Sequence, residues 1–444
     1  MTVPRTICLG FLVVISLGSL LLTLPSAVTG GSWGNPLVAL FTSTSAVCVT
    51  GLVVVDTGTY FSSFGQAVIV ALIQIGGLGY MTATTLLLLL LGQRLKLKDR
   101  VAIQQSMDQT ELAGGKALLP SIIAMTMVFE IAGVFCFYPI FRGEYGAGQS
   151  LWLSVFHSVS AFNNAGFSLF FDNIIGYQDH LWINLIISLL IIFGGLGYEV
   201  IVEMFMGLRT YVKGSRKRLN LSLNYKIVTS TTLVLLILGT LALFATEFNN
   251  PDTLGNLPLP IKLLAAWFQS VVARTAGFNS IDIGAMGNAS LFTMIALMFI
   301  GASPGGTGGG IKTTTFRILL VCTLAVLQGK EKVLCYQRQI PPTRVLKTVA
   351  VVVGSGLVVI LATMLISISN PELNFIAVLF ETVSAFATVG LSTGITAKLS
   401  AFSQVVIIVT MYLGRVGVLL FMAALLGDPK PTVVQYPEED LLIG

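Results

Sequence analysis

Long apolar runs alternate with shorter, partly polar stretches along the whole chain. The long runs are about 20 residues or more, the length that an α-helix needs to cross a bilayer. They fall near residues 7–28, 67–91, 118–140, 180–207, 226–247, 289–328, 347–368 and 401–426. Only the run at 289–328 is visibly interrupted, by a glycine-rich segment. The pattern predicts an all-α integral membrane protein with eight spans.

The stretches inside each pair of long runs resemble one another. They align without gaps, and each opens on an aromatic residue and closes on glycine followed by Leu or Phe. They read FTSTSAVCVTGL (41–52), FHSVSAFNNAGF (156–167), WFQSVVARTAGF (267–278) and FETVSAFATVGL (380–391). Their glycines are spaced 115, 111 and 113 residues apart. This period indicates a fourfold internal repeat.

Each of these stretches is too short to cross a membrane. About 11 residues precede each glycine, and a helix of that length extends roughly 16 Å, half of the ~30 Å hydrocarbon core. Irregular backbone at that depth is tolerated only where it is buried in protein or lines a water-filled cavity. The expected unit is a helix, a re-entrant pore loop and a second helix, repeated four times in tandem around one central ion pore.

The repeats also predict the domain boundaries. The expected segments are repeat 1 (1–95), a cytoplasmic linker (96–117), repeat 2 (118–209), a cytoplasmic basic loop (210–225), repeat 3 (226–328) with an intramembrane gate loop (301–315), a cytoplasmic linker (329–346), repeat 4 (347–427) and a C-terminal tail (428–444). The tail turns apolar again after a polar start, which suggests packing against a neighbouring subunit.

Composition and charge support a membrane location. The chain is 55% hydrophobic and only 10% charged, against roughly 25% charged residues in soluble domains. Of its 25 basic residues, 18 lie in the segments on the side of the two termini. The positive-inside rule therefore predicts a multi-pass protein of the cell membrane with both termini cytoplasmic and the glycine loops facing outward. Two histidines and five scattered cysteines predict neither a metal cluster nor an enzyme.

The four glycine turns have the chemistry of a monovalent cation filter. Glycine adopts positive φ without steric cost, so carbonyl oxygens can turn toward a common axis and replace an ion's hydration shell. No carboxylate lies in any turn, which disfavours a divalent ion. We expect K⁺, with Na⁺ as the alternative, at the backbone carbonyls of Val49, Thr50, Gly51, Asn164, Ala165, Gly166, Thr275, Ala276, Gly277, Thr388, Val389 and Gly390.

These motifs also carry a resemblance to a known family. The turn TVGL at 388–391 looks like the filter motif of potassium channels, and the fourfold repeat resembles the Trk/Ktr/HKT superfamily of cation transporters, closest to the bacterial KtrB membrane subunit. Because all four filter positions are glycine, the resemblance implies K⁺ uptake; in this family a serine at the first position accompanies sodium selectivity. It further implies a homodimer docked on a cytosolic nucleotide-binding regulatory ring (KtrA-like). Membrane lipid is the other expected partner, and neither nucleic acid nor an organic cofactor is expected.

The stretch GASPGGTGGGIKTTT (301–315) follows an apolar half-span. Its 12 preceding residues extend roughly 18 Å, so we expect the break at the membrane midplane, where the other three repeats would simply continue their helices. The segment reads as a flexible loop that closes the pore. The expected gate residues are Gly301, Ala302, Ser303, Pro304, Gly305, Gly306, Thr307, Gly308, Gly309, Gly310, Lys312 and Arg415.

Arg415 lies inside the last span, and an arginine at that depth costs at least about 2.5 kcal/mol. It should therefore face water or acceptors, either as an electrostatic barrier that donates hydrogen bonds to the loop carbonyls or as a partner of a buried acid. The resemblance implies the first of these roles. Glu130, Glu199 and Glu203 also lie in apolar spans and are expected to pair with Lys312, Arg317 or neighbouring spans, with proton or ion coupling as the alternative. Arg274 and Glu381 flank or precede filter turns and are expected to tie the short helices to their surroundings.

Two further interpretations remain to be compared with the pore. A secondary active transporter could place its substrate site at the broken helix 289–328, because transporters use glycine- or proline-interrupted spans. A phosphate-binding loop would need GxxxxGK[ST] after a strand, whereas Ile311 separates the glycines from Lys312 here. The pore is the leading hypothesis.

Overall fold

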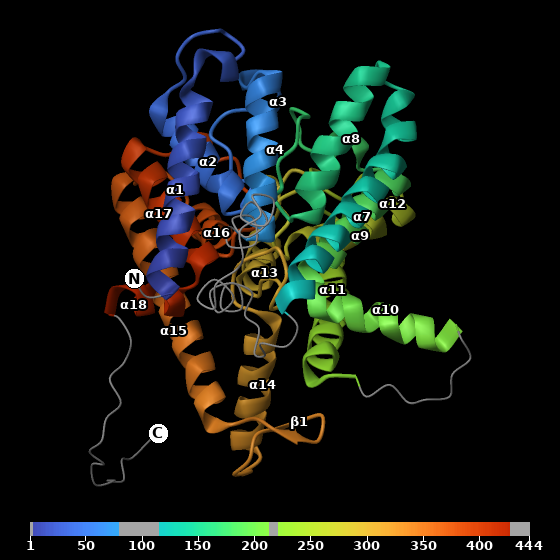
Figure 1. Cartoon of the computed structure of the whole chain (residues 1–444), viewed down its shortest axis with the longest axis vertical. Helices are drawn as coiled ribbons and strands as arrows, with labels where there is room; N and C mark the ends of the chain where they lie inside the picture. The colour runs from blue at the N-terminus through green and yellow to red at the C-terminus, as the bar shows by residue number, and fades with distance from the viewer. Residues whose placement is uncertain (1–2, 80–114, 213–220, 427–444) are drawn as a thin grey trace.

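The computed structural model describes residues 3–79, 115–212 and 221–426, and the structure there is almost entirely helical (Figure 1). Four described helices are long and apolar enough to span a membrane, and each of them opens one repeat. They are α1 (Val3–Thr23), α7 (Gly115–Arg142), α11 (Leu223–Glu247) and α15 (Pro342–Ser369). The expected all-α membrane fold is confirmed. The tail, residues 428–444, lies outside the described residues.

A shorter helix packs against the long helix of each repeat. These pore helices are α2 (Pro36–Val47), α8 (Ala147–Phe162), α12 (Leu259–Val272) and α16 (Phe375–Phe386). Local sequence explains where they begin. The side chain of Asn35 accepts a hydrogen bond from Leu37 N, and that of Asn374 accepts one from Ile376 N, as N-cap residues do. With 12 to 16 residues, none of the four is long enough to cross a membrane.

The third pore helix is offset by one residue from the gap-free alignment. Ser43 and Ser158 each donate to a carbonyl of the long helix behind them, at 2.7 and 2.6 Å. In the third repeat Ser270 makes this bond, at 2.9 Å, and it lies one position closer to the filter glycine. The offset also makes Phe268, rather than Trp267, the structural counterpart of the other fully buried phenylalanines: Phe41, Phe156 and Phe380.

The closing helices of the other repeats end early too, so the expectation that they continue is wrong. The helices α4 (Ser63–Leu78), α9 (Leu181–Leu196) and α17 (Ala401–Val416) each end at a glycine with positive φ, at Gly79, Gly197 and Gly417. A left-handed residue cannot continue an α-helix. After it, α10 (Tyr198–Val212) turns by 108° and α18 (Val418–Leu426) by 93°. In Figure 1, α10 leaves the body sideways.

In the third repeat the break is an extended loop. The helix α13 (Asn288–Phe299) ends before it, and α14 (Thr313–Leu327) begins after it. The interruption was therefore predicted correctly, but its last three residues, 313–315, belong to α14. Below the body, α14 and α15 are joined through a small antiparallel hairpin, β1 (Leu334–Cys335) and β2 (Arg338–Gln339) (Figure 1).

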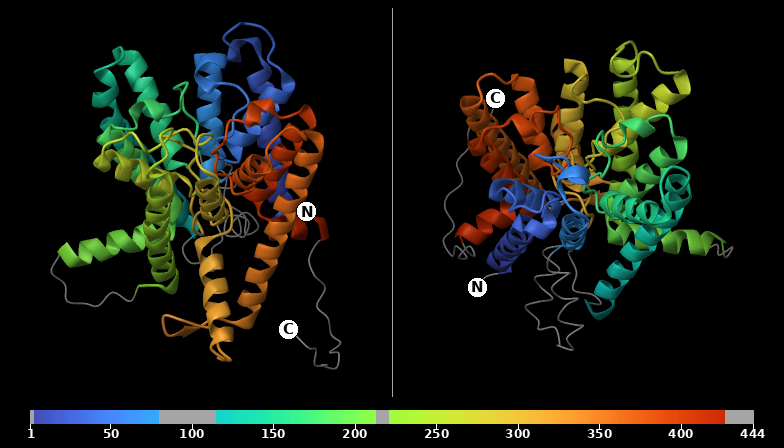
Figure 2. Two further views of the ribbon diagram at one scale, coloured as in Figure 1. Left: turned by 180° about the vertical axis from the view of Figure 1, so that it is seen from behind. Right: turned by 90° about the horizontal axis from the view of Figure 1, so that it is seen from above.

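The repeats surround a common centre in the view from above (Figure 2). The first helix meets the last two described helices, α17 and α18, which closes the ring of repeats. Arg5 Nε on α1 donates to the carbonyl of Ala424 on α18 at 2.7 Å, and the Tyr412 hydroxyl on α17 donates to the carbonyl of Cys8 at 2.9 Å. The pore helices and their turns lie inside this ring.

Candidate ion pathway

The turns that follow the four pore helices share one backbone pattern. In each, the filter glycine and the residue two positions before it adopt positive φ, a conformation that residues other than glycine rarely take. The φ angles are 55° and 93° for Val49 and Gly51, 57° and 69° for Asn164 and Gly166, 70° and 72° for Thr275 and Gly277, and 52° and 92° for Thr388 and Gly390. The third turn has the same pattern of φ angles, although its pore-helix residues lie one position closer to the filter glycine than those of the other repeats.

The four filter glycines lie against one another in a closed ring. A Cβ atom at Gly51 would lie 2.5 Å from the carbonyl oxygen of Ala165, which precedes the next filter glycine. The order continues around the ring: Gly166 faces the carbonyl of Ala276 at 2.8 Å, Gly277 faces that of Val389 at 2.6 Å, and Gly390 faces that of Thr50. These contacts bring together eight of the twelve residues expected in the filter, and the other four directly precede them in the turns; the eight are Thr50, Gly51, Ala165, Gly166, Ala276, Gly277, Val389 and Gly390. Close approach as well as positive φ favours glycine at these four positions.

Hydroxyl groups inside the pore helices hold three of the turns. Gly51 N donates to Ser45 Oγ at 3.0 Å, and Gly390 N donates to Ser384 Oγ at 3.1 Å. In the second repeat Ser160 Oγ donates to the carbonyl of Phe167 at 2.7 Å. These serines were not among the predicted site residues, although they lie six residues before the filter glycine in all three repeats.

The loop predicted to be the gate lies directly against the fourth predicted filter turn and the end of α9. Gly309 N donates to Thr388 Oγ1 at 3.0 Å, which joins the loop to the fourth filter turn. The loop also reaches the second repeat, where Thr307 N donates to the carbonyl of Gly194 at 3.1 Å and Ser303 N to that of Gly195 at 3.0 Å. These bonds satisfy backbone groups that would otherwise be costly in a membrane interior.

Arg415 connects this loop to the first repeat. Its guanidinium donates to the carbonyl oxygens of Thr307, in the loop, and Gly76, on α4. The described partners of Arg415 are therefore carbonyl groups from two segments, and no acid is among them. Lys312 Nζ donates to the carbonyl of Gly308 at 3.0 Å. Both basic residues expected at the gate thus contact the loop backbone.

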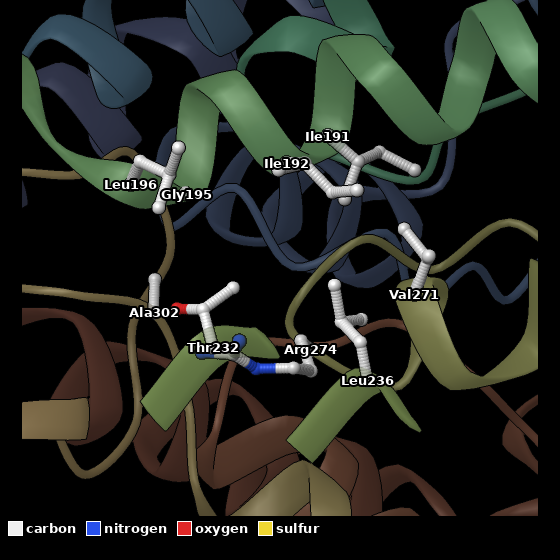
Figure 3. Close-up of a pocket in the computed structure, with 9 residues that line it drawn as sticks. All are labelled: Ile191, Ile192, Gly195, Leu196, Thr232, Leu236, Val271, Arg274 and Ala302. Carbon is white, nitrogen blue, oxygen red and sulfur yellow. The ribbon is translucent and has the colours of Figure 1, made fainter. Parts of the chain in front are cut away.

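Arg274 contacts the opposite end of the loop. It follows the third pore helix, and its Nη2 donates to the carbonyl of Gly301 at 3.1 Å. Its Nε and the hydroxyl of Thr232 are buried without a hydrogen-bond partner among the described residues, beside a small cavity that α9 and Ala302 also line (Figure 3). Arg274 therefore connects the third filter turn to the start of the gate loop.

The acidic residues of the spans make polar contacts with neighbouring helices. Glu130 accepts from Asn163 Nδ2 at 2.9 Å and from Gln74 Nε2 at 3.3 Å, close to the second filter turn. Glu203 accepts from Ser222 N at 3.0 Å, and Glu199 accepts from the side chain of Asn224 at 3.2 Å, where α10 meets the start of α11. Asn163 was not predicted to be a partner of Glu130, because the sequence does not show which way a side chain beside a filter turn points.

Comparison with known proteins now decides the family. The sequence profile of the TrkH family, described as cation transport protein, matches residues 9–430. The chain belongs to the TrkH family. The resemblance inferred from the sequence is thereby confirmed, and the chain is a membrane transport protein rather than an enzyme.

Members of the Ktr systems are among its relatives over their full length. The chain is 38% identical to Ktr system potassium uptake protein B of Bacillus subtilis, covering 100% of this chain and 97% of the relative. It is 40% identical to the protein of the same name from Vibrio alginolyticus, covering 99% and 95%. It is 35% identical to the potassium/sodium uptake protein NtpJ of Enterococcus hirae, covering 99% and 97%.

A solved structure supports the fold. The potassium transporter TrkH from Vibrio parahaemolyticus superposes with a TM-score of 0.71 at 19% sequence identity, covering 95% of this chain and 84% of that protein. At this identity the match speaks for the architecture alone.

Proposed function

We propose that this protein takes up potassium through a pore whose selectivity filter is the ring of four glycine turns. The observation that carries the proposal is the closed ring itself, in which each filter glycine lies against the carbonyl of the next repeat. Such a ring supplies several neutral oxygens around one axis, which suits a dehydrated monovalent cation. The names of relatives at 35–40% identity, all potassium or potassium/sodium uptake proteins, point the same way.

We assign the gate to the loop between α13 and α14 together with Arg415. Support comes from the loop's position against the third and fourth filter turns and from the hydrogen bond of Arg415 to Thr307. A guanidinium at the pathway raises the energy of a passing cation, and its bond to the loop favours the closed arrangement. Opening then requires the loop to move and Arg415 to exchange carbonyl partners for water.

We also propose that the protein works in the plasma membrane as a homodimer, with cytoplasmic termini and a cytosolic nucleotide-binding regulatory ring. The charge distribution supports this orientation. The relatives named protein B of a Ktr system support a multi-subunit assembly. Crosslinking followed by native mass spectrometry of the solubilised protein tests the dimer, and a dominant monomer would contradict it.

Potassium uptake by a transport-deficient bacterial strain tests the central proposal. Cells expressing the wild-type chain should grow at low K⁺ and accumulate K⁺, whereas a Gly51→Ser variant should shift uptake toward Na⁺. Flux through a pore should also depend weakly on temperature, since no large conformational cycle accompanies each ion. No uptake of either ion by a correctly inserted wild-type protein would refute the proposal, and a steep temperature dependence would favour a carrier.

A further inference from the structure

One polar position recurs behind each filter turn. It directly follows the fully buried phenylalanine of each pore helix and is occupied by a different residue in every repeat: Thr42, His157, Gln269 and Glu381. All four side chains are at most 1% exposed. Burying a polar group is costly unless it is hydrogen-bonded, so the recurrence calls for partners.

Three of the four have a partner of the same kind, a serine on the chain that leaves the filter. His157 Nε2 lies 3.0 Å from Ser168 Oγ. Ser392 Oγ donates to Glu381 Oε2 at 2.8 Å. Ser168 and Ser392 each lie two residues after their filter glycine. Each pair therefore connects a pore helix to the residues that directly follow its own filter glycine. We call these residues the outgoing limb of the filter turn.

The third repeat makes the same connection through its shifted helix. Gln269 Nε2 donates to Ser280 Oγ at 3.5 Å, the longest of the three contacts. The fourth repeat has the most extensive connection, because Thr396 Oγ1 also donates to the Glu381 carboxylate and lies 3.0 Å from Ser392 Oγ. The order of strength is thus the fourth repeat, then the second, then the third.

The first repeat lacks the connection. Thr42 Oγ1 is buried and has no hydrogen-bond partner among the described residues. The position two residues after Gly51 is Val53, which cannot donate or accept through its side chain. The outgoing limb of the first turn is therefore held without the bond that the other three possess.

We propose that Glu381, His157 and Gln269 are positioning residues that fix the outgoing limbs of filter turns two to four, and that K⁺ discrimination depends on these bonds. The inference rests on the proposed filter. A carbonyl ring selects ions by the number and placement of its oxygens. When the outgoing limb is no longer bonded to its pore helix, those oxygens can move inward and coordinate a smaller ion. The first turn, which has no such bond, contributes least to this constraint.

The test removes single hydroxyl groups from the limb side. Ser392→Ala and Ser168→Ala, purified and reconstituted in liposomes, are compared with wild type for initial K⁺ and Na⁺ uptake. The K⁺-to-Na⁺ ratio should fall by about three- to tenfold, the equivalent of one net hydrogen bond, with the larger fall for Ser392→Ala. Ser392→Thr, which keeps the hydroxyl, should restore the ratio.

Thr42→Val is the matched control, since it removes a buried hydroxyl that has no hydrogen-bond partner in the part of the chain that the structure describes. Its ratio should equal that of wild type. The proposal is overturned if both serine variants keep the wild-type ratio, or if Thr42→Val lowers it equally. Thermal melting shows whether each serine variant is folded. If one is not, Ser280→Ala takes its place, and the same two outcomes would overturn the proposal. Absence of K⁺ uptake in wild type would instead contradict the proposed function.

Discussion

Arg415, on α17, donates a hydrogen bond to the carbonyl of Thr307 in the middle of the loop between α13 and α14. The two residues are 108 positions apart in the chain and belong to different repeats. A second donor of the same guanidinium holds the carbonyl of Gly76 on α4. One side chain thus ties the third repeat to the first and the fourth, so its removal should affect the loop directly.

Replacing Arg415 by alanine should raise K⁺ flux. The variant loses a positive charge from the pathway and frees the Thr307 carbonyl, and both changes favour an open loop. Initial rates of K⁺ uptake into proteoliposomes measure the effect. Arg415→Lys should give an intermediate rate, because lysine keeps the charge but lacks the planar fork that reaches two carbonyls. A folded Arg415→Ala protein with unchanged or slower transport would contradict the assignment.

Deleting residues 305–310 should leave a folded protein that leaks potassium. The deletion removes Thr307 and Gly309, and with them the bonds to Gly194 and Thr388. On either side of the loop, α13 packs against α11 and α16 and α14 packs against α11 and α15, so the fold should persist. Size-exclusion chromatography checks assembly, and K⁺ efflux from loaded liposomes checks the leak. If the deletion variant showed the same K⁺ efflux as wild type, the assignment of the loop as the gate would be wrong.

Gly390→Ala should abolish selective uptake, and Gly394→Ala should not. Both glycines lie in the same loop with positive φ, 92° and 85°, so alanine is strained at either position. Only at Gly390 would the added methyl group meet backbone, the carbonyl of Thr50, whereas nothing lies within 4 Å at Gly394. Overpacking of this kind costs about 1–3 kcal/mol beyond the shared strain. Equal K⁺ uptake by the two variants would show that close approach is unimportant.

Arg274→Leu should loosen the start of the gate loop. The carbonyl of Gly301 then loses its donor, and a buried acceptor left unpaired costs about 1–3 kcal/mol. We expect faster K⁺ flux together with a lower melting temperature. Arg142→Leu is the control, since Arg142 is exposed and its one side-chain hydrogen bond within residues 3–79, 115–212 and 221–426 is to the nearby carbonyl of Tyr145. If the two variants behaved alike, the loss of a positive charge, and not of the Gly301 contact, would explain the effect.

The sequence alone determined the repeat, the filter glycines and the position of the loop. Each of these features follows from the order of residues alone. Apolar runs recur with a fixed period, each repeat has a glycine at the same position, and an arginine lies inside an apolar span, where it is energetically costly. Because each unit must bury the same face against its neighbours, the period implied a ring before any contact was known. Gly51 and Gly390 could be assigned to one site although 339 residues separate them.

The tertiary structure decided the features that depend on packing. The one-residue offset of the third repeat escaped notice because Trp267 and Phe268 are adjacent aromatics, and only burial distinguishes them. The bends at Gly197 and Gly417 were hidden because a glycine inside an apolar run is compatible with a continuous helix or a broken one. The partner of Arg415 is a backbone carbonyl, a group that every residue carries, so only the folded arrangement selects Thr307 and Gly76.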